Sequence, residues 1–335
     1  MTGRERVYRI FAGEPADRTG FWMGQPHRDS WPGLMAAFGV DSPEAVRRAL
    51  GDDYRWVCHQ GTSYRHPQGH PIFINPKSGN SLGAGGRFAD CEDPAEVDAF
   101  TWPDPAYLDL TAWIADLRAS GDRYRASGFW CPFFHDVAGY FGMENYFIKM
   151  MTAPEVVHAV TRHVVDFYLA GNERLFAAAR GEIDGFFFGN DFGSQLNLLF
   201  GPPQFEEFIA PYYRQLTGLA RSFGLQVIAH SCGSVHRLIP RMIELGVDAL
   251  HPLQAQAANM DAETLARDFK GRLAFMGGID TQRLLVHGTP DDVRREVRRV
   301  RELLGPRLVV SPSHEALLPD VPPANVRAMA EAARE

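Results

Sequence analysis

The chain has 335 residues, of which 45% are hydrophobic and 22% charged, so it can bury a large core and is not expected to be disordered. Its formal net charge is -7 and it has no long basic run, which argues against nucleic acid as a partner. The charged start lacks the apolar region of a signal peptide, and no apolar run approaches the ~20 residues that span a bilayer. Four widely spaced cysteines without a Cys-x-x-Cys pair favour a reduced, cytoplasmic protein that does not act at a membrane.

Short apolar runs alternate with amphipathic stretches along the chain. The apolar runs predict eight strands, within Thr19–Met23, Arg55–His59, Arg125–Phe134, Ile183–Phe188, Leu225–Ala229, Ala249–Leu253, Leu273–Met276 and Leu308–Val310. The stretches with helical periodicity predict helices over Pro43–Leu50, Tyr107–Ser120, Glu144–Ala178, Pro203–Phe223, Val235–Leu245, Asp261–Phe269, Pro290–Leu304 and Pro323–Arg334. The longest of these is expected to be two helices that meet near Pro154.

The alternation of strands and helices indicates the fold class. Helical crossovers make neighbouring strands parallel, and eight such units favour a closed (β/α)8 TIM barrel over an open sheet. No glycine-rich nucleotide-binding motif follows the early strands, which also argues against an open nucleotide-binding sheet. We therefore predict that residues 1–335 form a single α/β barrel domain with an N-terminal extension. The Asn-Pro and glycine-rich turns of Pro71–Asp90 predict a β-hairpin insertion.

Polar side chains follow the predicted strands, at the barrel face where such enzymes carry their chemistry. In chain order they are Gln25, His27, Arg28, His59, Gln60, His135, Asp136, Asn190, Asp191, Gln195, His230, Cys232, His251, Gln254, Asp280, His314 and Glu315. Polar residues after every strand exceed what a purely structural barrel needs. We expect Gln25, His27, Arg28, Asn190 and Asp191 to line a substrate pocket, with Arg28 as an anion clamp.

The fifth predicted strand runs into His230-Ser231-Cys232, which carries two potential metal ligands. If strand geometry continues, side chains two residues apart point to the same side. An imidazole and a thiolate on one side suit zinc, but two ligands do not make a site. This pair alone favours a buried cysteine beside a hydrogen-bonded histidine over a metal site. His314 could complete a three-ligand site with one open position, or instead bind a carbonyl or an anionic substrate.

Four longer segments resemble the uroporphyrinogen decarboxylase superfamily, which includes corrinoid-dependent methyltransferases of the methylcobalamin:coenzyme M type. They are LFGPPQFEEFIAPYYRQL (Leu199–Leu216), Leu225–Gln254, LAFMGGIDTQRLL (Leu273–Leu285) and SPSHEALLPDVPPANVRAM (Ser311–Met329). The resemblance covers nearly the whole chain and implies one (β/α)8 barrel with a deep cleft at the C-terminal face of the strands.

The resemblance places the chain closer to the methyltransferase branch. The His-x-Cys of that branch matches His230 and Cys232, whereas its later cysteine is replaced here by His314, a residue type that the decarboxylases carry. The decarboxylase motif M-R-Q-A-G-R is only partly kept in Met23–Arg28, and no equivalent of its catalytic aspartate is found near the second strand.

The resemblance implies a zinc-dependent methyltransferase or demethylase that holds Zn2+ with His230, Cys232 and His314. Its partners would be a small methyl donor or acceptor and a corrinoid carried by a separate protein. Two alternatives remain. One is a cofactor-free decarboxylase or lyase that binds a carboxylate through Arg28 and His314. The other is a non-catalytic barrel that binds a tetrapyrrole or corrinoid.

Overall fold

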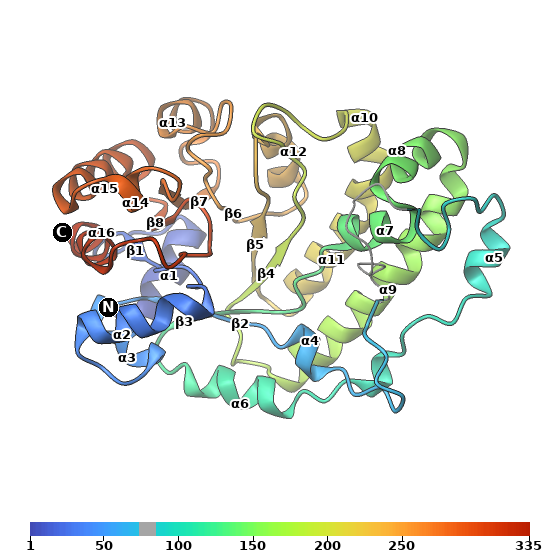
Figure 1. Cartoon of the computed structure of the whole chain (residues 1–335), viewed down its shortest axis with the longest axis horizontal. Coiled ribbons are helices and arrows are strands. Elements are labelled where there is room, and N and C mark those ends of the chain that lie inside the picture. The colour runs from blue at the N-terminus through green and yellow to red at the C-terminus, as the bar shows by residue number, and fades with distance from the viewer. Residues whose placement is uncertain (74–84) are drawn as a thin grey trace.

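The computed structural model describes residues 1–73 and 85–335, and its centre is a sheet of parallel strands surrounded by helices (Figure 1). The strand order is β1-β8-β7-β6-β5-β4-β3-β2, so every neighbouring pair but β1 and β8 is consecutive in the chain. The strands are β1 Gly20–Phe21, β2 Tyr54–Val57, β3 Tyr124–Ser127, β4 Gly185–Gly189, β5 Gln226–His230, β6 Ala249–His251, β7 Ala274–Ile279 and β8 Leu308–Pro312. The predicted (β/α)8 barrel and all eight of its strands are confirmed.

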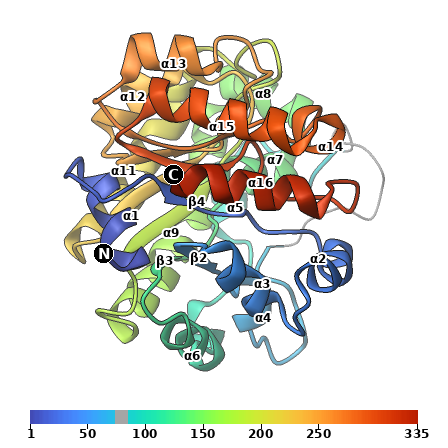
Figure 2. The ribbon, with the colours of Figure 1, turned by 90° about the vertical axis from the view of Figure 1, so that its left-hand side faces the viewer.

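Helices connect the strands and cover the outside of the barrel. They are α1 Gly3–Ala12, α2 Trp31–Phe38, α3 Pro43–Leu50, α4 Gln60–Ser63, α5 Pro94–Asp98, α6 Thr111–Ala119, α7 Phe133–Phe141, α8 Met143–Thr152, α9 Pro154–Ala178, α10 Pro202–Gln204, α11 Ala210–Ser222, α12 Ile239–Glu244, α13 Ala262–Phe269, α14 Leu284–His287, α15 Pro290–Leu304 and α16 Pro323–Arg334. α15 and α16 run side by side (Figure 2), and they pack over β7, β8 and β1.

Three helices have the predicted bounds. Each begins at a proline and ends where the amphipathic pattern of the sequence ends. α3 is capped by Ser42, α15 has a capping box at Thr289, and α16 follows Pro322. The predicted helix over Pro203–Phe223 is interrupted by a π-helix, Phe205–Ile209. Pro211 follows it and has no N–H to donate, which explains the local break in the regular hydrogen-bond pattern.

α1 closes the end of the barrel at which the strands begin. Its Val7, Ile10 and Phe11 are buried among inward-facing strand side chains such as Tyr54 and Tyr124. The Phe11 and Tyr124 rings meet edge to face at 5.3 Å. The predicted N-terminal extension is helix α1, which fills one end of the barrel. Because this end is filled, a ligand can reach the barrel axis only from the opposite end.

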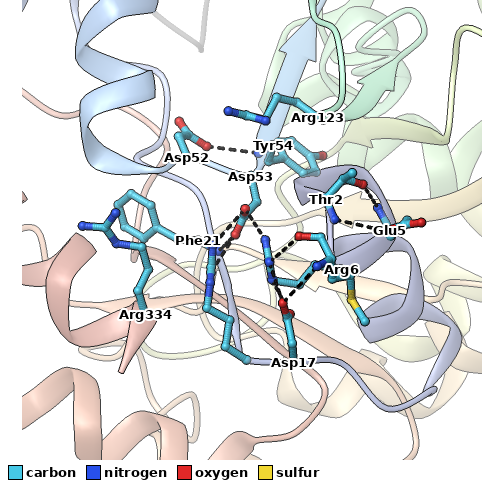
Figure 3. Close-up of polar contacts among 12 residues, drawn as sticks. Thr2, Glu5, Arg6, Asp17, Phe21, Asp52, Asp53, Tyr54, Arg123 and Arg334 are labelled. Atoms are coloured by element: carbon cyan, nitrogen blue, oxygen red, sulfur yellow. Dashed lines mark hydrogen bonds and ion pairs between the residues drawn. The ribbon is translucent and has the colours of Figure 1, made fainter.

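The junction between β1 and β2 is held by a side chain in place of a regular ladder (Figure 3). The Asp53 backbone N–H donates to the Phe21 carbonyl at 2.9 Å, and the Asp53 carboxylate accepts the Phe21 N–H at 3.1 Å. That carboxylate also accepts hydrogen bonds from Arg6 at 2.7 Å and Arg18 at 2.8 Å. One buried carboxylate therefore joins α1 to both strands and completes the nearly closed barrel.

Most of the predicted β-hairpin insertion, 74–84 of Pro71–Asp90, lies outside the described residues. All four cysteines are free thiols. Within the described part of the chain, no helix combines the length and the apolar character that crossing a membrane would require.

Candidate metal centre

The site is built on the last inward-facing layer of the barrel. Phe187, Ile228, Ala249, Met276 and Val309 all belong to the apolar cluster inside it. Side chains on a strand return to the same face every second residue, so the layer above consists of Gly189, His230, His251, Gly278 and Ser311. Register places Gly189, His230 and His251 side by side on β4, β5 and β6, and Gly278 beside Ser311 on β7 and β8, whereas β6 and β7 are staggered, with Ala249 paired with Ala274. The barrel thus changes from apolar to polar in one step where its strands end.

The imidazole of His230 lies at the centre of this polar layer and is buried. Its Nε2 is 3.2 Å from Asp191 Oδ1 and 3.3 Å from Cys232 Sγ. Its Nδ1 is 3.0 Å from His251 Nδ1 and 3.7 Å from Glu315 Oε2. The two nitrogens of one ring therefore face two different sets of potential ligands.

Neighbouring loops fix the groups around His230. Asp191 Oδ1 accepts the Cys232 backbone N–H at 2.9 Å, and Gln254 Oε1 accepts the Gly233 N–H at 2.8 Å. The Trp130 ring packs against the His230 ring with centroids 4.9 Å apart. Trp130 occupies the space above Gly189, where an added Cβ would come within 2.2 Å of its ring. The glycine at the end of β4 is needed for this close approach.

The charges of the site are strongly coupled. Burial by itself would lower the pKa of His230, but its contacts with Asp191 and Cys232 raise that pKa to about 10. Burial would raise the pKa of Asp191, but the His230 contact keeps it well below its usual range. Burial raises the pKa of the Cys232 thiol, and this outweighs the opposite effect of His230. Without a metal, His230 and Cys232 therefore keep the protons that a bound cation would displace.

Two groups of potential ligands share His230 within the described residues, Asp191–His230–Cys232 and His230–His251–Glu315, and the ligand atoms in each lie within 4.8 Å of one another. An imidazole nitrogen, a thiolate and a carboxylate are the donors that zinc prefers. Zinc bonds of about 2.0–2.3 Å place tetrahedral ligand atoms roughly 3.5 Å apart. The 3.2 and 3.3 Å spacings around Nε2 match this value, so the first group fits a zinc ion.

His314, predicted as the third ligand, lies in neither group. Its Nδ1 accepts the Ala316 N–H at 3.1 Å and lies 3.6 Å from Glu315 Oε2. The side chain lines a cavity of about 380 Å³ together with Gln254, Asp280 and Ser313. Gln254 also holds the loop after Cys232, so this cavity borders the metal-ligand groups. Cavities of this size commonly hold small ligands.

The predicted substrate residues after β1 belong to neither group of potential ligands, although the Gln25 N–H donates to the Glu315 carbonyl at 2.6 Å. Gln25 is exposed and accepts a hydrogen bond from the buried Arg47 at 2.9 Å. His27 caps the short turn that follows by accepting the Asp29 N–H. The Arg28 side chain is 88% exposed and lies 3.4 Å from Asp29. Only a shift of this loop or a large ligand would bring Arg28 into contact with a substrate in the barrel.

Asn190, also predicted to bind substrate, is buried and joins two strand ends. Its side chain accepts the Phe134 N–H at 2.9 Å and donates to the Cys131 carbonyl at 3.0 Å. Those bonds occupy the amide, whereas Asp191 next to it is 42% exposed and reaches the ligand group. Of the predicted pair after β4, the structure brings only Asp191 to His230.

Three residues of the site were underestimated from sequence. In the sequence, His251 and Glu315 stand out only as two of the polar residues that follow the predicted strands, and Trp130 does not stand out at all. The signal in the sequence is a histidine at the end of two successive apolar runs, since His251 ends β6 as His230 ends β5. In the structure, two buried polar atoms also indicate the site. His251 Nε2 and Glu315 Oε2 have no hydrogen-bond partner among the described residues.

A family model described as Uroporphyrinogen decarboxylase (URO-D) matches residues 136–335, more than half of the chain. The chain belongs to the uroporphyrinogen decarboxylase family. The segment matched in this family contains both groups of potential ligands, from Asp191 to Glu315. The predicted resemblance is thereby confirmed at the level of the family.

Comparison with solved structures supports the same fold. A methyltransferase from Methanosarcina mazei is similar over 99% of this chain and 98% of that chain, with a TM-score of 0.68 and 16% sequence identity. At this identity the likeness shows the shared fold alone. The search of curated proteins found no match.

Proposed function

We propose that this member of the uroporphyrinogen decarboxylase family is a zinc-dependent methyltransferase or demethylase. It would move a methyl group between a small substrate and a corrinoid carried by a separate protein. The observation that carries the proposal is the convergence of Asp191, His230 and Cys232 on one point at the open end of the barrel. Support also comes from the family and from the fold shared with a methyltransferase.

In this proposal His230 and Cys232 are metal ligands, as predicted, and Asp191 replaces His314 as the third. The buried imidazole provides a fixed anchor, whereas the thiol and the carboxylate are partly exposed and can be reached by an incoming ion. The two anionic ligands balance the charge of Zn2+. When bound, zinc supplies a Lewis acid that stabilises a substrate thiolate or oxygen anion at the open coordination position.

The remaining residues would bind and orient the substrate. The 380 Å³ cavity beside the ligands is lined by polar residues, among them Gln254, Asp280 and His314, and by apolar residues such as Val286 and Leu318. We therefore place a small substrate with both polar and apolar groups there, with His314 as a contact and not as a ligand. Arg28 is too exposed to act as the carboxylate clamp that the decarboxylase alternative requires.

Metal analysis tests the proposal directly. Protein purified without added zinc should contain about one zinc per chain, and Cys232→Ser should lose it because a serine hydroxyl is a poor zinc ligand at neutral pH. Cys91→Ser is the matched control, since Cys91 lies in the core and donates only to the Asp93 carbonyl. Wild-type protein without metal, or unchanged zinc in Cys232→Ser, would refute the proposed site.

A transfer assay separates the enzyme from the binding-barrel alternative. Zinc-loaded protein is mixed with free methylcobalamin and a small thiol, and loss of the methyl–cobalt absorbance is followed. We expect turnover by the wild type and by Cys91→Ser, and none by Cys232→Ser. If methylcobalamin binds to the wild type but is not consumed with any of a panel of thiol, hydroxyl and amine acceptors, the non-catalytic barrel is favoured.

A further inference from the structure

The two groups of potential ligands cannot both bind a cation through His230, because they share its imidazole ring. A neutral imidazole has a single lone pair, and its other nitrogen carries a proton. The Asp191–Cys232 group faces Nε2 of His230, whereas the His251–Glu315 group faces Nδ1. A cation on Nε2 therefore requires a proton on Nδ1, and that proton needs an acceptor.

We propose that His251 is a positioning residue that accepts the Nδ1–H of His230 and so directs the Nε2 lone pair to the metal. This inference rests on the proposed zinc site and identifies which of the two groups holds the ion. The 3.0 Å contact between the two Nδ1 atoms is a hydrogen-bond distance, whereas the 3.7 Å distance to Glu315 is not. His251 would then touch the metal site only through His230.

The surroundings of His251 favour its role as acceptor. It is fully buried at the end of β6, and the groups that face it are His230, His314, Asp191 and Glu315. A ring that accepts the Nδ1–H of His230 has no proton on its own Nδ1. A neutral ring with an unprotonated Nδ1 carries its proton on Nε2.

The environment of His251 Nε2 agrees with a proton there. This atom is buried and has no hydrogen-bond partner among the described residues. The rings of Trp22 and Phe187 pack against His251, each with centroids 5.3 Å away, and Phe187 stands at 84° to it. The negative face of an aromatic ring tolerates an N–H but repels a lone pair. The opposite tautomer would place an unpaired lone pair in this aromatic environment.

The backbone makes the pairing a property of the fold. His230 and His251 are register partners in adjacent parallel strands, and the Ser231 N–H donates to the His251 carbonyl at 2.8 Å. The acceptor is thus held by the β5–β6 ladder and does not depend on a loop. Glu315, in contrast, follows β8 and comes from the loop that carries His314. Backbone hydrogen bonds between β5 and β6 fix the position of His251, which suits a residue that must accept a proton from one direction.

The test compares two substitutions at one position. In Asn the side-chain oxygen is attached to Cγ, as Nδ1 is in His, so His251→Asn can still accept the proton, whereas His251→Leu cannot. Zinc affinity, measured by competition with a chelator, should fall about 10–100-fold in His251→Leu and be mostly restored in His251→Asn. Both variants should unfold at similar urea concentrations if the difference is not one of folding.

Cobalt substitution shows whether His251 touches the metal. The Co2+ form should show a sulfur-to-cobalt charge-transfer band and visible bands of a four-coordinate site. We expect His251→Leu and Glu315→Gln to keep these bands and Cys232→Ser to lose the charge-transfer band. Loss of the visible bands in both His251→Leu and Glu315→Gln, with zinc still bound to wild type, would place the ion in the second group. That result would overturn the role of His251 and leave the proposed function standing.

Nitrogen NMR of the metal-free protein gives a readout independent of zinc. The His251 signals are assigned by their absence from His251→Asn. We expect the Nδ1 shift of an unprotonated acceptor for His251 and of a protonated nitrogen for His230. A protonated His251 Nδ1 would overturn the inference even if zinc binds, whereas absence of zinc together with the expected shifts would refute only the proposed function.

Discussion

Each nitrogen of the buried His230 imidazole faces a different pair of side chains. His230 is fixed by burial, by Trp130 and by its strand partner His251. Other titratable residues near the strand ends have different roles. Asp136, in the first turn of α7, is held by a 2.6 Å hydrogen bond from the Tyr168 hydroxyl. Burial raises its pKa to about 7 in spite of that bond.

Asp136 should make the stability of the protein depend on pH. Because its folded-state pKa is raised, its contribution is fully present below about pH 4 and is lost as pH rises through about 7. Asp136→Asn keeps an acceptor for Tyr168 and removes the charge. Relative to wild type, this variant should gain stability as pH rises from 4 to 8, by about 1.4 kcal/mol for each unit of pKa difference.

Urea unfolding at a series of pH values measures this effect. Asp122→Asn is the matched control, since Asp122 is exposed and should leave the pH profile of the free energy of unfolding unchanged. A profile for Asp136→Asn that runs parallel to that of the wild type would show that the carboxyl is not desolvated in solution.

At the scale of elements, the critical junction lies between β1 and β2, at the closed end of the barrel. β1 is two residues long, and the Asp53 carboxylate accepts its Phe21 N–H, which a backbone carbonyl would accept in a regular sheet. The same carboxylate holds Arg6 of α1, whose side chain is 7% exposed (Figure 3). A buried pair of this kind adds little to stability by itself, but removal of one partner leaves an uncompensated charge.

We expect Asp53→Ala to destabilise the protein by about 3–5 kcal/mol, because Arg6 and Arg18 lose the acceptor that they share. The free energy of unfolding in urea measures it. Arg48→Ala is the control: Arg48 pairs with Glu44 but is 68% exposed, so its loss should cost about 0.5 kcal/mol or less. A cost below about 1 kcal/mol for Asp53→Ala would mean that the carboxylate does not close the barrel.

At the scale of the whole molecule, the ends of the chain meet on one side of the barrel (Figure 1). Thr19 donates to the Ala333 carbonyl at 2.7 Å, which ties the start of β1 to the end of α16. α1 at one terminus and α16 at the other both pack on the strands. We therefore propose that residues 1–335 form one domain in which neither terminus can detach without opening the barrel.

A single domain should unfold in one cooperative step. Urea transitions followed by far-ultraviolet circular dichroism, which reports helices, and by tryptophan fluorescence should coincide. Trp22 lies inside the barrel and Trp113 lies outside it, on the buried face of α6, so fluorescence reports both layers. Two separated transitions would indicate that part of the chain folds independently.

The eight strands and most of the long helices between them can be predicted from the sequence alone. Buried parallel strands are apolar runs and amphipathic helices show a 3.6-residue period, so local pattern is sufficient for α3, α15 and α16. It also identified His230 and Cys232 as a pair, because they stand two residues apart at a strand end. It missed α2 and α7, where glycine, proline and aromatic residues obscure the helical pattern.

Tertiary structure decided which distant side chains share a point in space. Asp191, His251 and Glu315 come from three different strand ends, and only the register of β4 to β8 brings them to the His230 ring. The same geometry leaves Arg28 exposed and directs Asn190 to backbone groups of the β3 loop. Sequence periodicity fixes the face on which a side chain lies, but the height and direction of each side chain around a barrel depend on strand stagger, which is a property of the closed sheet.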